Sequence, residues 1–187
     1  MSIFTLNSNA AETIKLPTPD KTGGKPLMQV LDKRVSTRDY SAKALDDKTL
    51  SDILWAAYGV NIKGTRTIPT ANNKKNLKVY ALLASGVWFY DSEKHQLEQV
   101  QNEDLRPVFA KQDFVKTAPL TLVYVGSDKK YSALHAGSSY QNVGLYAASK
   151  GLAAVVRNLY DDAEVNQAMK LTGDDFVITT ITVGWGK

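Results

Sequence analysis

Residues 131–150, the longest stretch with helical character, constrain the fold most because they are unusually rich in small side chains. Small residues let a second helix or a stretch of backbone approach closely, although they lower helix propensity. Such a surface needs a close partner. The segment is therefore either a central core helix or a dimer-interface helix, two interpretations of about equal weight. Gly151 is predicted to end it. The small residues are Ala133, Ala136, Gly137, Ser138, Ser139, Gly144, Ala147 and Ala148.

Strand-like segments lie on both sides of this helix. β-Branched and aromatic residues predict a hairpin over 77–91 with its turn at Ser85-Gly86, followed by a third strand at 96–100. No βαβ repeat is visible, so the mixture indicates an α+β fold. Further strands are predicted at 120–125, 152–156 and 176–183, and helices at 27–34, from Asp46 or Asp47 to Gly59, in short pieces over 105–116, and at 161–171.

Length and composition bound the function classes. A chain of 187 residues with 43% hydrophobic residues suits one domain, assigned to residues 27–187, preceded by a tail or extended arm at 1–26. The net charge of +4 includes no run of five like charges, which argues against nucleic-acid binding. No apolar run reaches the ~20 residues of a membrane helix. The first dozen residues do not form an intact signal peptide, so a cytoplasmic location is expected and export stays open.

Several kinds of site have no signature in this sequence. It contains no cysteine, no phosphate-binding P-loop, no Rossmann glycine motif and no nucleophile elbow. The two histidines, His95 and His135, do not form a metal-binding pair, so no metal site is expected. His95 lies in a charged hairpin segment and is predicted to be exposed. His135 is predicted to be a packing histidine with its hydrogen bonds satisfied rather than a catalytic base.

One segment, Arg34-Val35-Ser36-Thr37-Arg38, has the chemistry of an anion site. In extended backbone, residues at i, i+2 and i+4 point to the same side, so Arg34, Ser36 and Arg38 would face one ligand. Two guanidinium groups and a hydroxyl suit a phosphate. A single motif of this length also occurs by chance on protein surfaces.

The order and spacing of several motifs resemble the FMN-dependent nitroreductase superfamily over residues 27–187. Arg34–Tyr40 resembles the family's opening R-x-S-x-R-x-F/Y motif, and the loop at 66–71 and the hairpin at 88–97 are most similar to the subgroup of azoline-oxidising dehydrogenases. The resemblance implies a central, mainly antiparallel sheet flanked by helices, with a long central helix at a homodimer interface. The other matching blocks are Leu50–Gly59, Arg66–Ala71, Gln112–Val115 with Ala118-Pro119, Ala136–Asn142 and Val183–Trp185.

The resemblance implies a role in binding FMN for each matching position. Arg34 and Ser36, with Val35 between them, would hold the phosphate and nearby ribityl oxygens. Arg38 would be the catalytic residue, meeting the pyrimidine edge and stabilising the anionic reduced flavin. Gln112 is a second candidate for that edge. Pro69, Thr70, Ala71 and Asn73 would reach the flavin of the partner subunit, and Val156, Arg157 and Asn158 would present backbone groups to N5 and O4 of the ring.

Two departures from the family pattern affect these expectations. Lys74-Lys75-Asn76 follows Asn73, where many relatives carry Asn-x-Gln-Pro. Late basic residues that contact the phosphate in many relatives have one counterpart here, Lys187.

Three functions are compatible with the sequence. The leading hypothesis is a homodimeric oxidoreductase that takes hydride from NAD(P)H and reduces nitroaromatic, quinone or related small organic acceptors by a ping-pong mechanism. A second is an FMN-dependent dehydrogenase that oxidises a ring or peptide substrate. The third is a non-catalytic flavin-binding protein.

Overall fold

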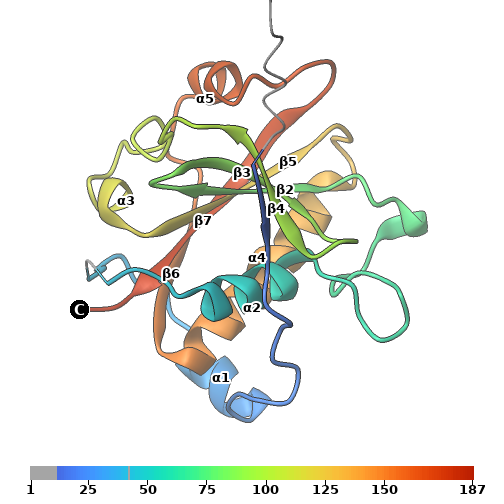
Figure 1. Ribbon diagram of the computed structural model, residues 1–187, viewed down its shortest axis with the longest axis vertical. Helices are drawn as coiled ribbons and strands as arrows, with labels where there is room; N and C mark the ends of the chain where they lie inside the picture. Colours follow the sequence, from blue (N-terminus) through green and yellow to red (C-terminus); the bar gives the residue numbers. More distant parts are fainter. Residues whose placement is uncertain (1–11, 42) are drawn as a thin grey trace, which may run out of the picture.

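The strands lie in one sheet with the order β1-β4-β3-β2-β5-β7-β6 (Figure 1), and each neighbouring pair is antiparallel. This computed structural model describes residues 12–41 and 43–187. The strands are β1 Thr13–Lys15, β2 Lys78–Leu83, β3 Gly86–Asp91, β4 Gln96–Gln101, β5 Leu120–Gly126, β6 Leu152–Arg157 and β7 Phe176–Trp185. The helices are α1 Leu27–Lys33, α2 Asp47–Tyr58, α3 Phe114–Thr117, α4 Ser132–Lys150 and α5 Asp162–Ala168, with a 3-10 turn at Ala71–Asn73. The predicted α+β class and antiparallel sheet are confirmed.

The sheet separates two apolar clusters, because successive side chains of a strand point to opposite faces. On one face, Val79 and Ala81 of β2 pack with Ile53 and Leu54 of α2 and with residues of α4. On the other face, Leu82 packs with the 105–109 segment and α5. β5 is buried along its whole length, as expected for a strand covered on both faces.

α2 starts and ends where the sequence predicted, although the reason for its final glycine differs. The Asp46 side chain accepts a hydrogen bond from the Thr49 N–H (2.7 Å) and caps the helix. Gly59 has φ −68°, so it does not supply a left-handed cap. It leaves space instead, because a Cβ there would collide with the Trp55 ring and lie 2.7 Å from the Trp55 carbonyl oxygen.

The small residues of α4 bring it close to the end of α2. The Ser139 hydroxyl donates to the Ala57 carbonyl (2.7 Å), and the Asn142 side-chain amide donates to the Ala56 carbonyl (3.1 Å). These contacts satisfy carbonyl groups at the α2 C-terminus that lack helical partners. Gly151, with φ 76°, ends α4 in the left-handed conformation predicted for it. The core interpretation of this helix is therefore correct for the face that meets α2.

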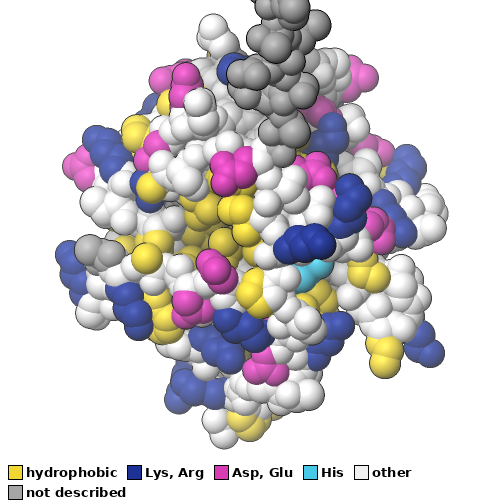
Figure 2. Space-filling model, viewed as in Figure 1, with side chains coloured by type: hydrophobic (Ala, Val, Ile, Leu, Met, Phe, Trp, Pro, Cys, Tyr) yellow, Lys and Arg dark blue, Asp and Glu magenta, His cyan; other side chains and the backbone are white. Residues whose placement is uncertain are grey.

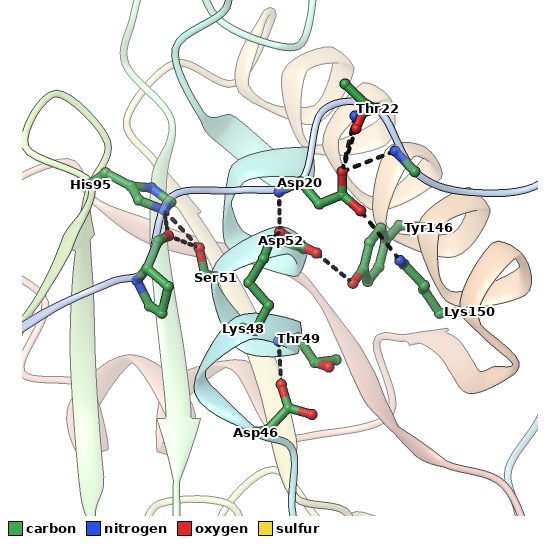
Figure 3. Close-up of polar contacts among 12 residues, drawn as sticks. Asp20, Thr22, Asp46, Lys48, Thr49, Ser51, Asp52, His95, Tyr146 and Lys150 are labelled. Carbon is green, nitrogen blue, oxygen red and sulfur yellow. Dashed lines mark hydrogen bonds and ion pairs between the residues drawn. The ribbon is translucent and has the colours of Figure 1, made fainter.

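The N-terminal arm is more ordered than the sequence indicated. β1 pairs with β4 at the sheet edge, after which the arm crosses α2 and reaches α1 (Figure 1). Asp52, which is 4% exposed, accepts hydrogen bonds from the Asp20 N–H (2.8 Å), the Lys48 ammonium (2.6 Å) and the Tyr146 hydroxyl (3.1 Å). Figure 3 shows this carboxylate between the arm and the two helices. Asp52 thus joins three elements.

His95 is half-buried beneath the same arm, so the prediction that it is exposed was wrong. Its Nε2 lies 2.8 Å from Ser51 Oγ and 3.1 Å from the Pro17 carbonyl, and its Nδ1 lies 2.8 Å from the Tyr90 hydroxyl. The charged residues that flank His95 in the sequence suggested that its ring is exposed to solvent. The arm covers it instead, through contacts that are distant in sequence.

The 105–116 segment contains less helix than predicted. Only Phe114–Thr117 is helical, and residues 105–109 form turns. Arg106 holds this segment, because its guanidinium pairs with Asp104 (2.6 Å) and donates to the Ala118 carbonyl (2.9 Å). These side-chain contacts hold the segment, which lacks the continuous backbone hydrogen bonds of a helix.

Candidate functional site

The Arg34–Tyr40 segment runs beside strand β6 immediately after α1. The Arg34 N–H donates to the Val30 carbonyl (2.9 Å) and ends the helix. The Thr37 N–H then donates to the Ala154 carbonyl of β6 (3.0 Å). The Tyr40 hydroxyl donates to the carbonyls of Thr37 (3.0 Å) and Thr182 (3.1 Å). Thr37 and Tyr40, three residues apart, are thus attached to the sheet, while Arg38 and Asp39 between them are exposed.

Arg34, Val35 and Ser36 line a small hollow of about 110 Å³ together with Val156. Its opposite wall is α4, where Gly144 has no side chain beyond a hydrogen, and the Arg34 stem lies 3.8 Å from where a Cβ would be. Four predicted cofactor residues therefore come together. The lining residues that sequence reasoning missed are Tyr140, Gln141, Gly144, Ala154, Val155 and Ile181.

Arg38 is exposed and does not line this hollow, whereas Val35 does, so the predicted arrangement of Arg34, Ser36 and Arg38 on one side of an extended segment is not seen. Within residues 12–41 and 43–187, neither the Arg34 nor the Arg38 guanidinium has an ion-pair or hydrogen-bond partner. The positive charge of Arg38 acts to lower the pKa of both Tyr40 and Arg157. Burial raises the pKa of the Tyr40 phenol, and the two guanidinium groups oppose that rise.

Gln112 and Arg157, two further predicted cofactor residues, contact each other. The Arg157 Nε donates to Gln112 Oε1 (3.1 Å), and its Nη2 donates to the Phe109 carbonyl (2.9 Å). Arg157 is 5% exposed, and its Nη1 is buried without a hydrogen-bond partner among the described atoms. Burial lowers the pKa of this guanidinium. Asn158, next along the chain, is exposed.

The loop with Pro69, Thr70, Ala71 and Asn73 lies elsewhere in the subunit. The Ala71 N–H donates to His135 Nε2 (2.9 Å), near the start of α4. Gly144 beside Arg34 is nine residues further along α4, which is ~14 Å at the rise of an α-helix. Within one subunit, the loop and the Arg34 hollow are therefore separate.

Lys187 is the last predicted cofactor residue. Its ammonium pairs with the Asp39 carboxylate (3.1 Å), and both side chains are largely exposed. The structure places this pair beside the Arg34–Tyr40 segment through the contact of Tyr40 with Gly186. An exposed pair of this kind is weak and can be exchanged for another anion.

Two larger hollows lie along the N-terminal arm and contain none of the predicted cofactor residues. One, of about 440 Å³, is lined by Trp55, His95 and residues of the arm. The other, of about 470 Å³, is mainly apolar and includes Leu16, Leu45 and Leu83. Figure 2 shows apolar side chains around a hollow on the face that the arm crosses. In the described part of the chain, no group of acidic and histidine residues could hold a metal ion, and no helix is long and apolar enough to cross a membrane.

Comparison with known proteins identifies the family. The model of the nitroreductase family matches residues 31–185, which include the Arg34 segment, α2, α4 and strands β2 to β7. The chain belongs to the nitroreductase family. This assignment confirms the resemblance found in the sequence and makes the protein an oxidoreductase of the flavin-dependent type.

Individual relatives agree with this assignment. A protein of Methanocaldococcus jannaschii, provisionally named a nitroreductase, is 31% identical over 86% of this chain and 91% of its own. A crystal structure from Ralstonia eutropha, also provisionally named a nitroreductase, has a TM-score of 0.89 and 38% identity over 96% of this chain and 91% of that one. A third, from Anabaena variabilis, shares the fold at a TM-score of 0.80 with 19% identity, over 95% of this chain and 42% of that one.

Proposed function

We propose that this family member binds FMN at the Arg34 hollow and uses it to transfer electrons from NAD(P)H to a small organic acceptor such as a nitroaromatic or a quinone. The observation that carries the proposal is the pair of guanidinium groups at Arg34 and Arg38, which have no acidic partner among the described residues. Unpaired guanidinium groups beside a hollow suit a phosphate and a flavin ring edge.

The residues present fit such a cofactor in their chemistry. Arg34 and Ser36 supply a charge and a hydroxyl for the phosphate at one wall of the hollow. Val156 supplies an apolar surface at the opposite edge. The Nη1 of Arg157 is buried without a hydrogen-bond partner among the described atoms, so it is free to donate to a bound ligand beside Gln112. Lys187 can leave Asp39 for the phosphate, because that pair is exposed.

Bound FMN supplies the ring that accepts and donates hydride, so the protein needs no nucleophile or metal of its own. Arg34 and Ser36 hold the phosphate end and thereby fix the position of the ring. Arg38 would supply a permanent positive charge to the pyrimidine edge and so favour the anionic reduced form of the cofactor. A donor and an acceptor that share one binding site would give ping-pong kinetics.

The size of the hollow favours a homodimer. A volume of about 110 Å³ is well below the ~300–1,000 Å³ typical of ligand pockets, so another surface must complete the site. Next to it, α1 and the segment after it expose Leu27, Met28, Leu31 and Val35. An exposed apolar patch of this kind marks an interaction site. The loop at 69–73, remote from the hollow in its own subunit, is then available to the hollow of the partner.

The absorption spectrum of the purified protein tests the cofactor, and Arg34→Ala tests its site. Losing a charge-assisted phosphate contact should weaken FMN binding ~10- to 100-fold, so this variant should purify pale, while its thermal unfolding should match that of flavin-free wild type. Lys33→Ala, the neighbouring cation on α1, is the matched control and should stay yellow. Equal flavin occupancy in Arg34→Ala and wild type would overturn the assignment. Bleaching by NADH or NADPH separates an enzyme from a flavin-binding protein without turnover.

Light scattering of the flavin-bound protein tests the dimer. The expected mass is twice that of the 20.5 kDa chain, with an interface above ~2,000 Å² if association is obligate. A mass of one chain in the flavin-bound state would contradict it.

A further inference from the structure

His135 holds the loop between Thr70 and Asn76 against the start of α4. Its Nε2 accepts a hydrogen bond from the Ala71 N–H (2.9 Å), and its Nδ1 lies 3.2 Å from Asn76 Oδ1. One ring therefore contacts both ends of the loop. The ring is 2% exposed, so water cannot take the place of either contact without movement of the backbone.

These two contacts specify the protonation state of the ring. A backbone N–H can only donate, so Nε2 must be the unprotonated nitrogen that accepts. Nδ1 then carries the proton and donates it to the Asn76 amide oxygen. Both contacts are made at once only by the neutral tautomer with its proton on Nδ1. A second proton, on Nε2, would point at the Ala71 N–H and remove its acceptor.

The loop needs such a contact because its conformation is unfavourable by itself. Asn72 and Asn73 have φ of 52° and 55°, in the left-handed region, which asparagine enters more readily than most residues but which two consecutive residues seldom share. Conformations of this kind persist where the surroundings hold them in place. Besides His135, the loop is held by the ion pair of Lys74 with Asp128 (3.1 Å), whose side chains are partly exposed.

We infer that His135 is a positioning residue, which fastens the 70–76 loop while its ring is neutral and releases it when the ring is protonated. The inference rests on the proposed function only in its consequence, because the loop carries Thr70, Ala71 and Asn73, the residues proposed to reach the partner's flavin. Release of the loop should then weaken FMN binding at the partner's site. The fastening itself can be measured without flavin.

The surroundings of the ring favour its neutral form. Burial is the larger effect and lowers the pKa of His135, whereas Asp128 opposes that fall. Lys74 pairs with Asp128 (3.1 Å) and lies 5.0 Å from the centre of the Tyr131 ring, and Lys130 lies 5.1 Å from the same ring centre. The pairing with Lys74 limits the effect of Asp128 on His135.

The direction of the pH dependence follows from the lowered pKa. The neutral ring makes the contacts, so they are present in full above the unfolded-state value of about 6.5 and are lost as the pH falls below it through the folded-state pKa. Burial raises the pKa of the Tyr58 and Tyr124 phenols, which stay neutral.

The test compares His135→Gln and His135→Phe with wild type at pH 7.5 and pH 5. Glutamine presents an acceptor oxygen and a donor amide and does not titrate, so it should keep the loop fastened at both values. Phenylalanine fills the space without either contact, so it should release the loop at both. His95→Gln removes the only other histidine of the sequence and is the matched control.

Two measurements are made on these variants. Nitrogen chemical shifts of the His135 ring report its tautomer, and exchange of the Ala71 amide, corrected for intrinsic rates, reports the loop. We expect the Nδ1–H tautomer at pH 7.5 and at least ~10-fold less amide protection in His135→Phe. Wild-type and His95→Gln protein should lose protection as the pH falls through the folded-state pKa of His135, while His135→Gln should not. A ring protonated on Nε2 at pH 7.5, or unchanged protection in His135→Phe, would overturn the inference.

A third measurement is FMN affinity, which links the loop to the site. From pH 7.5 to pH 5, affinity should fall about 10-fold more in wild type than in His135→Gln. The second ionisation of a phosphate, near pH 6, affects both proteins equally and cancels in this ratio. If no variant binds flavin, the proposed function fails while the ring shifts and amide exchange still decide the role of His135. If flavin binds with equal pH dependence in both proteins, His135 does not position the loop toward the site.

Discussion

Asp52→Ala should destabilise the protein more than any exposed ion-pair deletion, because this carboxylate joins the arm, α2 and α4. Its contacts with the Asp20 N–H (2.8 Å) and the Tyr146 hydroxyl (3.1 Å) are each worth ~1 kcal/mol, since net hydrogen bonds contribute ~0.5–1.5 kcal/mol. Burial raises the pKa of Tyr146, so its phenol stays protonated and donates. Lys48, nearly half exposed, adds only ~0.3–0.5 kcal/mol as a helical i, i+4 pair.

The expected loss is therefore ~2–3 kcal/mol of unfolding free energy, or ~4–12 °C in Tm for a chain of this size. Urea unfolding followed by tryptophan fluorescence measures it. Lys48→Ala is the matched control and should cost less than ~0.5 kcal/mol. Added salt should reduce the small Lys48 effect and leave most of the Asp52 effect, because the other two contacts are shielded from solvent. If Asp52→Ala were no less stable than Lys48→Ala, the carboxylate would not join the arm to the helices.

Three further predictions follow from single features of the structure. Arg38→Ala should slow flavin reduction ~100-fold or more at saturating FMN, as expected for loss of ~2.7–4 kcal/mol of transition-state stabilisation, and Arg38→Lys should have a milder effect. Stopped-flow bleaching by NADH and NADPH measures these rates, and wild-type rates in Arg38→Ala would refute the role of Arg38. Gly59→Ala should lose ~1–3 kcal/mol by urea unfolding, because its Cβ would displace the Trp55 ring, whose Nε1 donates to the Val60 carbonyl (3.0 Å); unchanged stability would mean that the ring moves freely. Burial lowers the pKa of His95, so its neutral form should stabilise the fold fully above pH ~6.5 and less as the pH falls. His95→Gln should flatten this pH dependence of the unfolding free energy, and an unchanged dependence would show that His95 is not its source.

Local signals in the sequence were sufficient for most elements of the fold. The cap of α2, predicted at Asp46 or Asp47 and found at Asp46, and Gly151 as the end of α4 depend on neighbouring residues. The hairpin was predicted as well, but its turn lies at Ala84-Ser85, one residue before the predicted Ser85-Gly86, because Gly86 pairs with Leu83 and begins β3. The pairing of β1 with β4 could not be predicted, because it depends on contacts far apart in the chain. The interactions of His95 with Pro17 and Ser51 were missed for the same reason.

The candidate site shows the same division. Arg34 and Ser36 share a hollow, but Val35 between them lines it too, so strict alternation does not explain their meeting. Arg38 departs from it, since Thr37 and Tyr40 are tied to β6 and β7 and turn the segment there. Gly144 lines the hollow because of the way α4 packs beside Arg34. The small-residue pattern of α4 indicated close packing in the sequence, but it did not indicate which segment α4 would contact. The roles in FMN binding stay predictions.

The position of β7 in the sheet has a consequence for synthesis of the chain. β7 lies between β5 and β6 and is the only strand that pairs with β6 among the described residues. A nascent chain that has been translated only through Gly173 therefore exposes the edge of β5, an apolar strand that is buried throughout in the finished fold. Unpaired apolar edges are sites of aggregation. Premature termination before residue 176 should therefore yield insoluble or chaperone-bound fragments rather than a smaller folded domain.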